Sequence, residues 1–163
     1  MGVVTLSKGF DRFCALSSYF SEKGEDRFVS VVVGRHGLDP ENYPKVNFVA
    51  KKNTYLSRKE FNEGVEKLDF ILFFYDNEQY RLTASGAIFD AIEHEKVIIA
   101  IRNDYFEEIF QKCGDLGFLC KDDTEVFEIV NKILGNELDY SHVYENIRRA
   151  KEIYDYRNQI ILL

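Results

Sequence analysis

The chain has 163 residues, of which 45% are hydrophobic and only two are prolines, and its formal net charge is −7. This length is sufficient for one domain with its own core, and the composition excludes both a disordered segment and a membrane-spanning helix. Because the negative charge opposes binding to a polyanion through the overall field, nucleic acid is not expected as a partner.

Three cysteines, Cys14, Cys113 and Cys120, form no C-x-x-C pair. An odd number without metal-ligand spacing is typical of reduced, buried thiols in a cytoplasmic protein rather than of disulfides or a zinc site. The N-terminus lacks the pattern of a signal peptide, and residues 2–5 have a strand pattern instead. We therefore expect a cytoplasmic protein whose sequence opens inside its first strand, as a piece of a longer chain would.

Apolar runs typical of strands alternate with helical patterns in the order β-α-β-β-α-β-α-β-α-β-α-α. Strands are expected at residues 2–5, 28–33, 46–50, 69–75, 97–101 and 117–119, and helices begin near residues 8, 57, 85, 104, 122 and 141. The segment 69–75 is the most apolar and is expected at the sheet centre. This order predicts an α/β fold, a Rossmann-like open parallel sheet with helices on both faces, formed by residues 1–163 as a single domain.

The C-terminal part, residues 141–163, is predicted to be an amphipathic helix followed by an apolar tail. Val143, Ile147, Ala150 and Tyr154 recur at helical spacing, and the chain ends with four apolar residues, 160–163. An exposed apolar terminus favours a partner surface.

The predicted helix starts differ in whether they can bind an anion. Those at Ser57, Asp104 and Asp122 carry a glutamate three residues later, which satisfies backbone donors and neutralises the positive end of the helix dipole. The starts at residues 7–10 and 83–88 lack that glutamate. They offer groups that suit a diphosphate, namely Lys8, Gly9, Thr83, Ser85 and Gly86. The competing interpretation is that a serine cap and a glycine turn are purely structural.

Other polar residues carry weaker signals. Asp90 follows Gly86 by one helical turn and could reach a ribose, although on spacing alone a solvated carboxylate is the stronger interpretation. The cluster 93–96 contains His94 between glutamates at a helix end, where a solvated turn is more common than a metal site. No metal site is expected. Neither G-x-G-x-x-G nor a Walker lysine motif is present.

Two segments resemble a known family. Residues 8–11, KGFD, resemble the "KG-x-D" start of the C-terminal domain of glycosyltransferases with the GT-B fold, especially group 1 (family 4). Residues 85–100 resemble its signature "S-G-x-x-x-E-A-x-x-x-G-K-P-V-I-A". The order of motifs matches over residues 2–134.

The resemblance implies the nucleotide-sugar-binding half of a two-domain transferase, which transfers a sugar from a nucleoside diphosphate to a glycan or lipid-linked acceptor in polysaccharide biosynthesis. The donor site would comprise Lys8, Gly9, Tyr80, Thr83, Ser85, Gly86 and Asp90, with Asp90 on the ribose and no cofactor or metal. An N-terminal domain would bind the acceptor, and the full enzyme would associate peripherally with membranes. This chain alone would then be inactive.

The sequence departs from the family pattern at two positions. The first glutamate of the family's E-x(7)-E pair would fall at Leu82, and an arginine that often precedes the lysine would fall at Val3. Glu78, Tyr80 and Arg81 lie in the same loop as potential substitutes. The catalytic residues stay unknown, with Lys8 and Arg81 as candidates for stabilising the charge on the leaving nucleotide.

Two other classes of protein fit the same pattern. One is a non-catalytic, flavodoxin-like interaction or regulatory module, for which the apolar tail would be a docking surface. The other is a sugar-nucleotide epimerase, whose carboxylates and histidine have no identifiable positions here. Nucleotide binding separates the interaction module from both enzymes.

Overall fold

The computed structural model describes residues 2–75 and 86–155 of the chain. Except for the first predicted strand, its helices and strands follow in the predicted alternating order. They are the 3-10 turn Leu6–Lys8, α1 Phe10–Glu22, β1 Val31–Val32, the 3-10 turn Pro40–Asn42, β2 Asn47–Phe48, α2 Arg58–Glu66, β3 Phe70–Phe73, α4 Gly86–Glu93, β4 Val97–Ile101, α5 Asp104–Cys113, β5 Gly117–Cys120, α6 Asp123–Leu134 and α7 Ser141–Tyr154.

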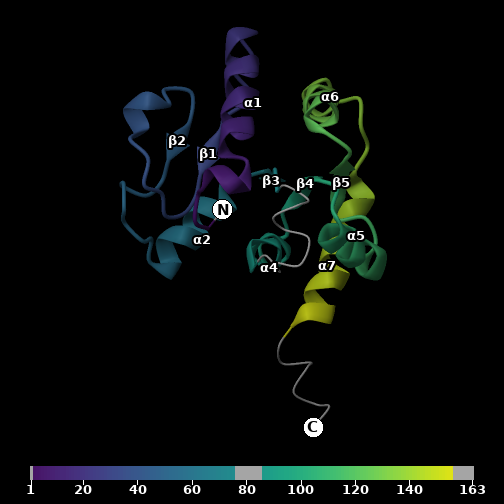
Figure 1. Ribbon diagram of the computed structural model, residues 1–163. Coiled ribbons are helices and arrows are strands. Elements are labelled where there is room, and N and C mark those ends of the chain that lie inside the picture. The colour runs from purple at the N-terminus through teal and green to yellow at the C-terminus, as the bar shows by residue number, and fades with distance from the viewer. Residues whose placement is uncertain (1, 76–85, 156–163) are drawn as a thin grey trace.

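All strand pairs are parallel, but they form two separate sheets (Figure 1). β1 pairs with β2 in the register Val31↔Asn47, and β4 lies between β3 and β5 in the registers Phe70↔Val97 and Ile98↔Gly117. All five residues of β4 are buried. The prediction that the 69–75 strand is central is therefore wrong for this arrangement, because β3 is an edge strand and β4 occupies the centre.

Helices cover both faces of the three-stranded sheet, as Figure 1 shows with α1 and α6 on one side and α4, α5 and α7 on the other. Alternate strand residues point to opposite faces, so Ile98 and Ala100 contribute to the cluster under α4, α5 and α7, while Ile99 and Ile101 pack under α1 and α6. Strand side chains that alternate between the two faces of the sheet, together with apolar stripes on the crossover helices, thus produce the predicted Rossmann-like α/β layers.

The first predicted strand is not formed as a strand. Gly2 has a left-handed φ of 76°, and residues 2–4 make two backbone hydrogen bonds, from the Gly2 amide to the Val33 carbonyl (3.1 Å) and from the Val4 amide to the Arg35 carbonyl (3.0 Å). Both bonds reach the chain that follows β1. The predicted strands 28–33 and 46–50 shorten to two residues each in β1 and β2.

Most predicted helix ends are confirmed. Ser57 and Glu60 form a reciprocal capping box, and the Asp122 side chain accepts the Glu125 amide. The predicted cap at Asp104 is wrong by one residue, because the Asn103 side chain accepts the Phe106 amide and Asp104 lies inside the helix. The first helix begins at Phe10 rather than Lys8, since Gly9 adopts a left-handed conformation that ends the preceding 3-10 turn.

The predicted C-terminal helix is confirmed as α7, which buries Val143, Ile147 and Ala150 against the core. Tyr154 stacks edge-on against Phe89 of α4. Residues 156–163, which include the apolar tail, lie outside the described residues. No helix within 2–75 or 86–155 is long and apolar enough to cross a membrane.

Candidate functional site

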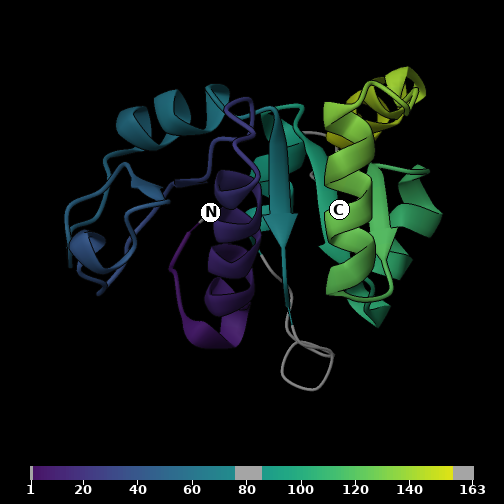
Figure 2. The same ribbon diagram turned by 90° about the horizontal axis from the view of Figure 1, so that it is seen from above.

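The carboxyl ends of the parallel strands form the edge at which an open α/β sheet binds ligands. Figure 2 shows β3 pointing toward the end of the molecule where α1 begins. Gly9, the residue that caps α1, lies directly against the end of β3: a Cβ atom at Gly9 would be 2.4 Å from the Phe74 Cβ and 2.6 Å from the Phe74 carbonyl oxygen. Only glycine allows this approach, so the first turn of α1 is held at the strand edge.

The first turn of α1 has no side-chain cap. Its leading amides lack partners within the helix, and they carry the positive end of the helix dipole. Asp11 is the only acid of that turn. In the part of the chain that the structure describes, no side chain caps these backbone donors, and one carboxylate lies beside them.

Lys8 lies immediately before this turn and is the cation closest to it in sequence. Its ammonium group is 5.9 Å from the centre of the Tyr75 ring, at the carboxyl end of β3. Partial burial lowers the pKa of Lys8, because desolvation disfavours the charged form. Among residues 2–75 and 86–155 no carboxylate pairs with it, so an anion bound here would offset that desolvation.

A second cation near this edge is already engaged within the fold. Arg12 forms a bidentate ion pair with Asp123, with Nε 2.7 and 2.9 Å from the two carboxylate oxygens, and its Nη1 donates to the Phe74 carbonyl at 3.0 Å. These contacts join α1, the end of β3 and α6. Nothing in the sequence predicted a pair between positions so far apart, and we assign Arg12 a structural role.

The start of α4 is the second predicted anion site. Gly86 is its first residue, a Cβ there would meet no atom within 4 Å, and the first turn contains no acid. Tyr80, Arg81, Thr83 and Ser85, together with Glu78 and Leu82, lie outside the described residues. Of the α4 part of the predicted site, the structure therefore describes only Gly86 and Asp90.

Asp90 has a protein partner. Its carboxylate is 3.2 Å from the Arg58 guanidinium of α2, and 28% of the side chain is exposed. A hydroxyl group of a ribose would have to share this carboxylate with Arg58 or displace it. The contact neither assigns nor removes the predicted ribose role.

Asn103 is a polar residue at the strand edge that the sequence pattern did not single out. It follows β4, is 2% exposed, and its Oδ1 caps α5 at 2.9 Å. Its Nδ2 is buried and has no hydrogen-bond acceptor in the described part of the chain. An asparagine two residues after a buried strand is the sequence signal that identifies such a donor.

The remaining polar candidates are structural. His36 is buried and its two ring nitrogens lie 3.2 and 2.9 Å from the carbonyl oxygens of Leu38 and Ala50. Glu93 and Glu95 pair with Lys151 of α7. Within the described residues no group of three or more histidine, cysteine or acidic side chains is placed to hold a metal ion.

The cysteines are free thiols, and Cys113 and Cys120 are buried as the sequence predicted, whereas Cys14, predicted to be buried as well, is only partly so. Burial raises the pKa of Cys120 to about 12, and it also raises the pKa of Cys113. Burial, with a smaller effect of Asp11, raises the pKa of Cys14 to about 11. None of them has the depressed pKa of a nucleophile.

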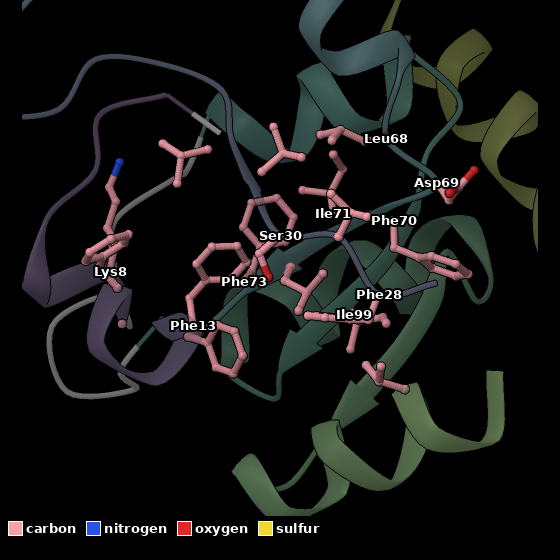
Figure 3. Close-up of a pocket in the computed structure, with 18 of the residues that line it drawn as sticks. Lys8, Phe13, Phe28, Ser30, Leu68, Asp69, Phe70, Ile71, Phe73 and Ile99 are labelled. Atoms are coloured by element: carbon pink, nitrogen blue, oxygen red, sulfur yellow. The ribbon is translucent and has the colours of Figure 1, made fainter. Parts of the chain in front are cut away.

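A cavity of about 740 Å³ lies beside the candidate site, between β1 and β3 (Figure 3). Phe13, Phe28, Phe70 and Ile99 line it, and Lys8 lies at one end with its ammonium group pointing away from the apolar side chains. Apolar walls do not suit a diphosphate. The polar candidate site is therefore the strand edge at the Lys8 end of this cavity, away from its apolar walls.

Comparison with known proteins adds no assignment to this geometry. No protein-family model matches the chain, and no curated protein matches it.

Proposed function

We propose that this domain binds a nucleoside diphosphate sugar at the carboxyl edge of its strands and is the donor-binding half of a glycosyltransferase. The observation that carries the proposal is the uncapped first turn of α1, held against β3 by Gly9, with the desolvated Lys8 beside it. Backbone amides, a helix dipole and a lysine are the groups that bind diphosphates in other α/β proteins.

The contrast among helix starts supports the same site. Side chains of Ser57, Asn103 and Asp122 cap α2, α5 and α6. Of these three starts, α2 and α6 also carry the first-turn glutamates that bond back to the chain before the helix. α1 and α4 differ from them, since α1 has no cap and α4 begins with an unobstructed glycine and no acid in its first turn. A diphosphate would satisfy the backbone donors at these two helix starts.

In the proposed reaction the domain stabilises negative charge on the departing nucleotide as the glycosidic bond breaks. Lys8 and the α1 dipole would act on the phosphate oxygens, and an electrostatic contact that strengthens as this charge develops lowers the barrier. Arg81, Thr83 and Ser85 keep their proposed phosphate roles, Tyr80 its donor-binding role and Asp90 its ribose role. The acceptor and any general base would come from a partner domain, in a cytoplasmic enzyme of polysaccharide biosynthesis.

The test is calorimetry and thermal denaturation with UDP, GDP, ADP and their sugar conjugates. A ligand that binds only the folded chain raises its melting temperature. Gly86→Asp adds an acid to the first turn of α4 and is expected to weaken binding more than Gly86→Ala, whose methyl group adds no charge and meets no protein atom within 4 Å. If no diphosphate binds the unaltered chain, the flavodoxin-like interaction module replaces this proposal.

A further inference from the structure

The cavity between β1 and β3 has two strand edges as its walls. Val29 and Val31 line one side and Phe70 and Leu72 the other. In the described part of the chain β1 pairs only with β2, and β3 only with β4. The two parallel sheets share covering helices, and in the described residues each ends at an edge strand, β1 or β3, that faces the other across the cavity.

The backbone groups of the β1 wall point into the cavity. Ser30 and Val32 direct their carbonyls to β2, where they accept the Asn47 and Val49 amides at 2.9 and 3.0 Å. Successive peptide groups of a strand alternate in direction, so Val29 and Val31 direct theirs to the opposite side. The Val33 and Arg35 carbonyls, on that same side, are the ones that accept from Gly2 and Val4.

The β3 wall has the same property. The Phe74 carbonyl faces away from β4 and accepts from Arg12 at 3.0 Å. By the same alternation, the carbonyls of Phe70 and Leu72 point to the cavity side. Each wall thus presents a row of donors and acceptors without a neighbouring strand, which is the arrangement that recruits one.

The two walls run in the same direction. At their carboxyl ends, residues 2–4 bond to the chain after β1 and Gly9 touches Phe74 after β3. At their amino ends, Phe28 and Asp69 line the opposite end of the cavity from Lys8, as Figure 3 shows. A strand between them would be parallel to both, and its carboxyl end would meet Gly2.

We propose that this cavity is a strand slot, filled by an extended apolar segment of about four residues that continues into Gly2 and joins the two sheets into one. The register supports this occupant. The Gly2 and Val4 amides already donate to the Val33 and Arg35 carbonyls, and the preceding residues on the same side of that chain, Val31 and Val29, line the cavity.

The chemistry of the occupant follows from what covers the slot. α1 buries Leu16 and Phe20 against Phe74 on one face, and Val65 of α2 packs with Val33 and Ile71 on the other. A strand covered on both faces carries a continuous apolar run rather than an alternating one. Val29, which is 63% exposed, would be covered by such a segment.

The test adds residues before Met1. One chain carries the extension Val-Ile-Val-Ile and its matched control carries Val-Pro-Val-Pro, which is apolar but lacks the amides needed for a ladder. We expect the first extension to raise the melting temperature by roughly 5 °C and to slow hydrogen exchange at the Val31 and Leu72 amides by about ten-fold or more. The proline extension should do neither.

A substitution in the slot wall provides a second check. Val31→Pro removes an amide that points into the slot and bonds to no described strand, so it is expected to leave the fold of the unextended chain intact while abolishing the effect of the Val-Ile-Val-Ile extension. Equal stabilisation by both extensions, or unchanged exchange at Val31 and Leu72 with either one, would overturn the proposal.

Discussion

The close approach of Gly9 to β3 leads to a quantitative prediction about stability. Gly9→Ala places a methyl group 2.4 Å from the Phe74 Cβ and 2.6 Å from its carbonyl oxygen, and backbone atoms cannot move aside cheaply. The left-handed conformation of Gly9, with φ of 73°, costs a non-glycine residue about 1 kcal/mol, and overpacking adds about 1–3 kcal/mol. We expect a loss of about 2–4 kcal/mol.

Gly24→Ala is the matched control, because Gly24 has a similar φ of 68° but no atom lies within 4 Å of the position that its added methyl group would take. It should lose only the conformational term of about 1 kcal/mol. Urea denaturation of both variants measures the difference. If the two substitutions cost the same, the contact between Gly9 and Phe74 does not exist in solution, and the placement of the α1 start at the strand edge is refuted.

Three further predictions concern other residues around the site. A double-mutant cycle of Arg12→Met and Asp123→Asn, measured by urea denaturation, should give a coupling free energy of about 1 kcal/mol. The same cycle on the exposed Arg27–Glu25 pair should give a coupling near zero, and equal couplings for the two pairs would contradict the structural role of Arg12. Asn103→Ala removes the α5 cap and should lower the free energy of unfolding by about 1 kcal/mol, while Asn103→Asp keeps the cap. If the Asp variant is stable and binds a diphosphate as well as the parent does, Asn103 Nδ2 is not part of the diphosphate site. The pKa of the Cys120 thiol is 9.0 in the unfolded chain and about 12 in the folded chain, so its contribution to stability is complete below pH 9 and is lost as the pH rises toward 12. Urea denaturation between pH 8 and 11 should therefore show a steeper decline in the free energy of unfolding for the parent than for Cys120→Ala. Parallel declines would contradict this assignment.

Local patterns predicted the elements well because their causes are local. The capping box at Ser57 and the stripe Val143, Ile147, Ala150 involve residues within a few turns of one another, and both are present in the structure. Where two adjacent residues compete for one cap, the pattern could not decide: Asn103 and Asp104 can both accept amides, and the choice of Asn103 depends on where β4 ends.

The sequence pattern could not predict strand order or contacts between residues that are far apart in the chain. The apolar run 69–75 predicted a central strand, yet in the described residues β3 has a neighbouring strand on one side only. Both of its faces are apolar because helices cover both faces of the sheet. The pair between Arg12 and Asp123 depends on the packing of α1 beside α6. The site residues that could be named from sequence were those at helix starts, because the physics of a helix end is contained in one turn.

The most direct test of the donor-site proposal is calorimetric titration of a nucleoside diphosphate sugar into the parent chain, Lys8→Met and Lys59→Met, in which the control lysine lies 85% exposed on α2. Losing a charge-assisted contact to phosphate costs about 1.5–3 kcal/mol, so Lys8→Met should raise the dissociation constant about ten-fold or more, while Lys59→Met leaves it unchanged. Affinity that is the same in all three chains would contradict the site at Lys8, and absence of binding to the parent chain would contradict the proposed function itself.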